Sequence, residues 1–178
     1  MSETMTVYFA SQTGHVFGAV TRAAGTIPTP PRAPSLEDVL VLNVGPEKDA
    51  ELLVPAADLS TLVLLPNPDL LLQHLAFQVS VQIDNVERLP PNATVSGVVL
   101  ASTQVEVSVS ASVAQDAAVW VLITGPTLPT PRVAVGVIKQ GKLKTDPPLL
   151  LQRLDPGTYR VLALVRGHPP VARSERIP

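Results

Sequence analysis

Clustered prolines divide this 178-residue chain more sharply than any other feature. The chain contains 19 prolines. Most of them fall in groups at 28–34, 66–68, 90–91, 126–131, 147–148 and 169–170. Between these groups lie apolar segments with few prolines. Because proline has no backbone N–H to donate, it is excluded from central strands. The proline groups therefore predict loops, and the apolar segments predict strands.

Two of the apolar segments have the period of a strand with one buried face. Every second residue is apolar in Leu75–Ile83, and valine or alanine alternates with polar residues in Gln104–Val113. Successive strand residues point to opposite faces, so this pattern predicts antiparallel strands with one face in water. By contrast, Val119–Ile123 is apolar on both faces, and so is Val161–Val165 within the predicted strand Tyr159–Val165. They predict central strands, or strands whose second face is covered by a partner. All four are expected in one sandwich, with its core between two sheets.

The beginning of the chain predicts a hairpin. Ser11–Gly14 separates the apolar segments Val7–Ala10 and Val16–Thr21, as a turn between paired strands would. Predicted helix is scarce. The sequence Asn67-Pro68-Asp69 is suited to cap one or two turns that end near His74, and Ser35 is a weaker helix start.

These elements predict two parts. Residues 1–66 form an N-terminal β module, 67–74 a short helical or turn connection, and 75–178 a C-terminal β-sandwich module. The segments Val7–Leu65 and Val107–Val165 follow the same order of hairpin, Pro-Thr-Pro loop, apolar strand, charged turn and apolar strand. An internal duplication into two related β modules is one explanation. Shared composition of loops and strands is the other.

One local motif resembles a known superfold. In Asp155-Pro156-Gly157-Thr158-Tyr159, a Pro-Gly turn leads into an apolar strand that begins with a tyrosine. The motif resembles the tyrosine corner of immunoglobulin-like sandwiches, in which the tyrosine hydroxyl bonds to upstream backbone. The resemblance implies an all-β, antiparallel, immunoglobulin-like sandwich. The cysteine pair of antibody domains is absent, so it implies no antibody-like function.

Composition excludes several kinds of chemistry. The chain has no cysteine, which removes disulfides, thiol nucleophiles and cysteine-bound metals. Its net charge of −2 gives no broad attraction to nucleic acid or anionic membranes. The sequence after Met1 lacks the basic and apolar segments of a secretory signal, and no apolar run reaches the roughly 18 residues of a membrane span. We therefore expect a cytoplasmic protein without a membrane span.

The titratable residues form no recognisable catalytic motif. His15, His74 and His168 lie far apart in the sequence and are expected in solvated loops or a short helix. The carboxylates of Glu47, Asp49 and Glu51 have part of the spacing of a calcium loop. Lys48 lies among them and no turn glycine follows, so a solvated turn is favoured. A Gly-x-Ser-x-Gly elbow and a phosphate-binding glycine loop are both absent. We expect no catalytic, cofactor-binding or metal-binding residues.

Ligand-binding patterns are equally sparse. The basic groups Lys139, Lys142, Lys144 and Arg166, Arg173, Arg176 have no aromatic residue beside them to stack on nucleic-acid bases. Trp120, the single tryptophan, lies inside an apolar segment, where it would not offer a platform to a carbohydrate. The sequon at Asn92 is expected to be incidental, since no secretion signal is present.

The remaining positive features favour a protein that works through its surfaces. Only 16% of the residues are charged and lysine occurs four times, which leaves few charges to protect sheet edges from pairing. We expect a non-enzymatic structural or interaction protein, a β-sandwich subunit of a homo-oligomer or of a larger assembly such as a phage- or tail-like particle. Its partners would be further copies of itself or other subunits, and not nucleic acid. A small-ligand or carbohydrate-binding β module is the alternative, and a hydrolytic enzyme is the third hypothesis.

Overall fold

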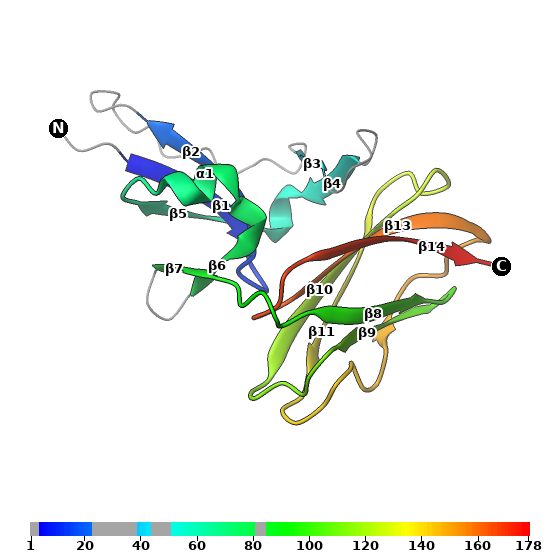
Figure 1. The fold of residues 1–178 in the computed structure, drawn as a ribbon. Coiled ribbons are helices and arrows are strands. Elements are labelled where there is room, and N and C mark those ends of the chain that lie inside the picture. Colours follow the sequence, from blue (N-terminus) through cyan, green and yellow to red (C-terminus); the bar gives the residue numbers. More distant parts are fainter. Residues whose placement is uncertain (1–3, 23–38, 44–50, 81–84) are drawn as a thin grey trace.

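The structure is a computed structural model that describes residues 4–22, 39–43, 51–80 and 85–178 (Figure 1). The described residues form several antiparallel sheets that do not close into a barrel, together with one short α-helix. The strands are β1 Thr4–Ala10, β2 Val16–Arg22, β3 Val39–Asn43, β4 Glu51–Pro55, β5 Leu59–Leu64, β6 Phe77–Ser80, β7 Asn85–Arg88, β8 Val95–Leu100, β9 Gln104–Val109, β10 Ala117–Thr124, β11 Arg132–Ile138, β12 Leu149–Leu150, β13 Gly157–Val165 and β14 Val171–Ile177. The all-β, antiparallel prediction is therefore confirmed.

The hairpin predicted around Ser11–Gly14 is present. β1 pairs with β2 on one side and β5 on the other, all antiparallel. Gly14 takes the left-handed conformation that the turn requires, with φ of 83°. The predicted short helix is also confirmed: α1 (Pro68–Leu72) begins with proline, and the side chain of Asn67 accepts a hydrogen bond from the backbone N–H of Asp69 at 3.0 Å. A 3₁₀ turn, η2 (His74–Ala76), follows. Ser35 and the first Pro-Thr-Pro loop lie outside the described residues.

The first core forms beneath the β2–β1–β5 sheet. Alternate residues of β1 face it and are buried. Its buried members are Met5, Val7, Phe9, Val16, Leu70, Phe77 and Val79. β6, which supplies Phe77 and Val79, pairs with β7. The prediction that this strand shares a core with the later strands is therefore wrong. Its alternation indicated one buried face correctly, but a period of two does not say which core that face meets.

The second core lies between two sheets of the C-terminal part, ordered β12–β9–β8 and β11–β10–β13–β14 (Figure 1). Alternate residues of β9, β10 and β13 point into it. From these three strands it buries Val105, Val107, Val109, Val119, Val121, Ile123, Tyr159, Val161, Ala163 and Val165. The three predicted strands are thus confirmed. β9 ends at Val109, four residues earlier than predicted. Val113 lies in the loop that follows, but its side chain is still buried, with 7% exposure.

The remaining residues of β10 and β13 face a third core on the other side of the four-stranded sheet. Trp120, Leu122, Leu162 and Leu164 pack there with Ala10, Phe17 and Val54 from the N-terminal strands. This explains why both strands are apolar on both faces. The cover for their outer face comes from the same chain, so these strands do not require a second protein.

Tyr159 has the environment that the motif predicted. Its side chain is 1% exposed, and its hydroxyl donates to the backbone carbonyl of Asp155 at 2.7 Å. A second contact of 3.2 Å joins the hydroxyl to the Oγ1 atom of Thr127. The ring also lies so close to Gly125 that a Cβ atom there would collide with it. The tyrosine corner is therefore confirmed.

The similarity between the segments Val7–Leu65 and Val107–Val165 does not extend to their strand order. In the first segment β1 pairs with β2 and with β5, and β3 pairs with β4. In the second segment β9 pairs with β8 and β12, whereas β10 pairs with β11 and β13. Strands at matching sequence positions thus have different neighbours, and the predicted superposition of two copies is wrong. Similar loops and Val/Leu strands account for the likeness.

Candidate functional site

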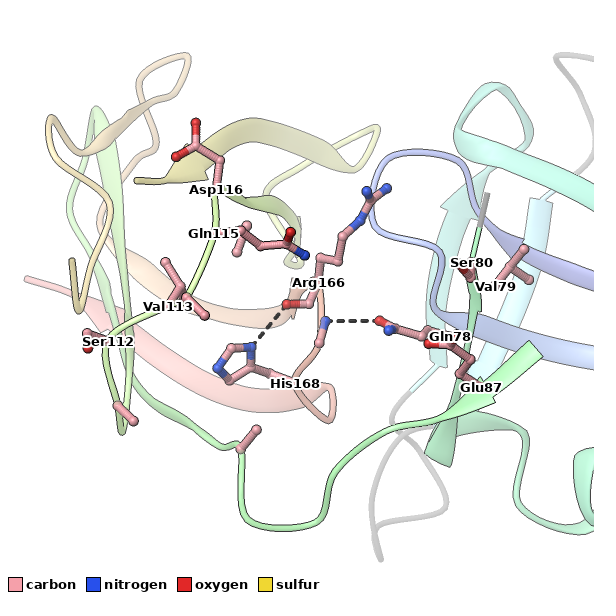
Figure 2. A pocket seen from close by; sticks show the side chains of 15 residues that line it. Gln78, Val79, Ser80, Glu87, Ser112, Val113, Gln115, Asp116, Arg166 and His168 are labelled. Carbon is pink, nitrogen blue, oxygen red and sulfur yellow. Dashed lines mark hydrogen bonds between the residues drawn. The ribbon is translucent and has the colours of Figure 1, made fainter. Parts of the chain in front are cut away.

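The turn between β13 and β14 is held by groups from the β1–β2 turn and from β6. Arg166 donates from Nη2 to the carbonyl of Gln12 at 3.2 Å. The backbone N–H of Gly167 donates to Oε1 of Gln78 at 2.9 Å (Figure 2). The carbonyl of His168 accepts from Nε2 of His15 at 2.7 Å. All three residues of this turn, Arg166, Gly167 and His168, therefore bond to the β1–β2 turn or to β6.

His15 is the most enclosed of these groups, with 0% exposure. Because the carbonyl of His168 can only accept, Nε2 of His15 carries the hydrogen, and Nδ1 accepts from the Thr13 hydroxyl at 2.9 Å. Burial lowers the pKa of His15 to about 4; the bond to His168 opposes this, and the charges of His168 and Arg166 add to it. His15 is therefore neutral at pH 7. The prediction of a solvated loop histidine is wrong here, because the hairpin turn is inserted against the β13–β14 turn.

The other two histidines lie in different surroundings. His168 is also buried, with 9% exposure, so the prediction of a solvated loop histidine is wrong for it too; its Nδ1 donates to the carbonyl of Arg166 at 3.1 Å. His74 lies in η2, where partial burial lowers its pKa. In the described part of the chain, no three His, Cys, Asp or Glu residues gather in a way that would hold a metal ion. Glu47 and Asp49 lie outside the described residues.

A hollow of about 490 Å³ opens beside this turn (Figure 2). It is bounded by β6, β7, the loop before β10 and the β13–β14 turn. Its lining residues are Gln78, Val79, Ser80, Glu87, Ala93, Ala111, Ser112, Val113, Ala114, Gln115, Asp116, Ala117, Arg166, Gly167 and His168. The lining combines small apolar side chains with amide, hydroxyl and charged groups of both signs. Such a surface can hydrogen-bond a small polar molecule but does not favour one charge.

Asp116 and His168, which both line this hollow, do not face one another. Asp116 accepts from Nζ of Lys139 at 2.8 Å and from the backbone N–H of Gln140 at 2.9 Å. These two hydrogen bonds lower the pKa of Asp116, with the Lys139 bond as the larger cause. Figure 2 shows its carboxylate pointing away from His168. A general acid–base role would require the two groups to meet at a shared substrate.

Two lysines of the basic group Lys139, Lys142 and Lys144 form ion pairs with carboxylates. Lys139 pairs with Asp116 and Lys144 pairs with Glu106, each at 2.8 Å. Trp120 is 0% exposed, and its ring centroid lies 6.4 Å from that of Phe17 at an interplanar angle of 55°. Trp120 is thus a core residue that joins β10 to β2, and its ring is not open to a carbohydrate.

The two edges of the four-stranded sheet differ in a way that sequence reasoning missed. β14 carries Arg173, Glu175 and Arg176, and Nη2 of Arg173 donates to the carbonyl of Ser96 in β8 at 3.3 Å. At the opposite edge, Val133 to Ile138 of β11 contains no charged residue and no proline. Val135 is 51% exposed and Val137 is 38% exposed. The absence of charge in this segment was the sequence signal for the unprotected edge.

No protein-family model, curated protein or solved structure matches this chain. No helix in the described residues is long and apolar enough to cross a membrane.

Proposed function

We propose that this protein is a non-enzymatic structural or interaction protein whose C-terminal part is an immunoglobulin-like β-sandwich, and that it works as a subunit of a protein assembly. A three-stranded and a four-stranded antiparallel sheet share one core, and Tyr159 bonds to the carbonyl of Asp155 at the start of β13. Both features are typical of the superfold. Fold alone does not define a function, so the functional argument depends on the surface.

The exposed edge of β11 carries this proposal. Sheet edges of monomeric proteins are usually protected by charge, proline, a bulge or a covering segment. β11 begins with Arg132 but has no charge or proline from Val133 to Ile138, and its pairing with β10 runs without a bulge. Among the described residues, no backbone hydrogen bond joins its outer edge to another strand. An edge of this kind favours strand pairing with another polypeptide.

The hollow beside the β13–β14 turn supports the second candidate, a small-ligand-binding module. Its volume of about 490 Å³ is within the usual range of ligand sites. Binding of a polar ligand would use Gln78, Gln115 and Arg166 from three different elements. A hydrolytic function has less support, because the Asp116 carboxylate is bonded to Lys139 and to the Gln140 backbone.

Light scattering across about a hundredfold dilution tests the assembly proposal, since association is concentration-dependent by mass action. We expect a mass above the 18.8 kDa of one chain at the highest concentration, falling on dilution. A persistent 18.8 kDa species would contradict self-assembly and leave only a different protein as partner. Stabilisation by a small polar compound, with no change in mass, would favour the ligand-binding module instead.

A further inference from the structure

We infer that two copies of this chain pair antiparallel along β11, about a twofold axis at Val135, and join their four-stranded sheets into one eight-stranded sheet. The inference rests on the proposed assembly function and specifies its partner and its surface. The partner is a second copy, because β11 complements itself.

From Val133 to Val137 the strand has the same alternation of valine and small residues in either direction from Val135, whereas its ends place Arg132 of one copy opposite Ile138 of the other. In an antiparallel pair centred on Val135, Val133 of one copy lies opposite Val137 of the other. Ala134 lies opposite Gly136, and Val135 lies opposite its own copy. Directly opposed β-branched residues are a favourable cross-strand combination. A twofold axis requires this self-complementarity of a contact surface.

The two faces of β11 support the same register. Val133 and Val135 are paired with Leu122 and Trp120 of β10, and so belong to the outer face of the sheet. Val133 packs against the third core, but half of Val135 is exposed. Three valines from a second copy would continue this apolar row beyond the edge of the sheet. On the inner face, Gly136 has no Cβ, which allows Leu149 to approach β11 closely.

The other edge of the sheet does not offer an equivalent site. β14 presents charged residues, and Arg173 bonds to the carbonyl of Ser96 in β8. Pairing along β14 would bury charged side chains and compete with the contact of Arg173 to β8. Association through β11 alone gives a closed dimer, whereas two free edges would give an open filament.

Pairing of one seven-residue strand with its copy forms a small interface, at the low end of specific contacts, which usually bury more than about 1,000 Å². We therefore expect a reversible dimer that dissociates within about a hundredfold dilution of a concentrated sample. Sedimentation velocity measures this equilibrium on the full chain.

Opposite charges at the centre of the pair provide the decisive experiment. Val135→Lys and Val135→Glu each place two like charges opposite one another, and each should remove the dimer at concentrations at which the unmodified chain is dimeric. A mixture of the two variants should restore it, because lysine would then face glutamate. The matched control is Val99→Lys, on β8, where the valine is 61% exposed; it should leave the dimer intact. Circular dichroism would verify that each variant remains folded.

Each result has a defined meaning. Restoration of the dimer in the mixture supports both the β11 contact and its register. A dimer that persists in Val135→Lys would overturn the β11 contact while leaving self-assembly in place. Monomeric variants whose mixture stays monomeric would overturn the register centred on Val135. An unmodified chain that is monomeric at every concentration would overturn this inference together with homo-assembly, and a different protein would then be the candidate for the β11 edge.

Discussion

Nε2 of His15 donates to the backbone carbonyl of His168 at 2.7 Å, across 153 positions of the sequence. The imidazole is fully buried, and its other nitrogen accepts from Thr13. A single neutral side chain therefore joins the first hairpin to the last one.

Stability should fall as the pH falls through the range set by His15. Its pKa is about 4 in the folded protein and near 6.5 in the unfolded chain. Between these values the unfolded chain binds the proton and the folded protein does not, so the free energy of unfolding decreases with decreasing pH. The full loss, reached below pH 4, corresponds to about 3 kcal/mol. Urea denaturation midpoints, measured at pH values from 7.5 down to about 4.5, would report this decrease in the free energy of unfolding.

The variant His15→Gln separates this effect from the titration of carboxylates. It should be less stable at pH 7.5 but lose less stability between pH 6.5 and 4.5 than the unmodified protein. His74→Gln is the matched control, since His74 is only partly buried and should leave most of the pH dependence unchanged. An identical acid slope in His15→Gln would contradict the assignment.

Gly14→Ala should destabilise the protein more than Gly141→Ala. Both glycines have positive φ, 83° and 76°, so alanine is strained at either position. A Cβ atom at Gly14 would also collide with the carbonyl oxygen of Val79, whereas nothing lies within 4 Å at Gly141. We expect a loss of about 1 kcal/mol at Gly141 and about 3 kcal/mol at Gly14, measured by urea denaturation. Equal losses would mean that the Gly14–Val79 contact is not close.

Tyr159→Phe should cost about 1 kcal/mol, because it removes the hydrogen bond to Asp155 while retaining the buried ring. The expected signature is a lower denaturant midpoint with an unchanged slope. Thr127→Val removes only the longer 3.2 Å contact of the same hydroxyl and should cost less. A midpoint unchanged in Tyr159→Phe would show that the hydroxyl bond contributes nothing to stability.

Leu122→Ala tests the third core. Leu122 is 0% exposed beneath the N-terminal strands, and its truncation should cost about 2–5 kcal/mol. Val99→Ala, at a position 61% exposed, should cost less than about 0.5 kcal/mol. Hydrogen exchange in β1 and β2 should increase in Leu122→Ala, since those strands lose a packing partner. Unchanged protection there would separate the N-terminal strands from this core.

Local sequence patterns predicted the elements that depend on local chemistry. The β1–β2 hairpin, the Asn67 cap, the strands β9, β10 and β13, and the tyrosine corner were all visible from spacing and turn residues. Each depends on interactions within a few residues or on the period of two. The apolar character of both faces of β10 and β13 also indicated that something covers them.

The sequence could not show which segments meet. The pattern predicted that β13 is either a central strand or covered by a partner, but it did not identify Phe17 and Val54 as the residues that cover its outer face, because no periodicity encodes that contact. His15 lacked any distinguishing neighbour in the sequence, because its environment comes from Arg166 and His168 on a distant turn. The placement of Phe77–Ser80 in the first core was missed for the same reason.

The third core also sets an order of events during synthesis. Phe17 is made 145 residues before Leu162, which shares its core together with Leu164. Synthesis at roughly 5–20 residues per second leaves the N-terminal hairpin without this apolar partner for about ten seconds. Throughout that interval the nascent chain carries an uncovered apolar surface.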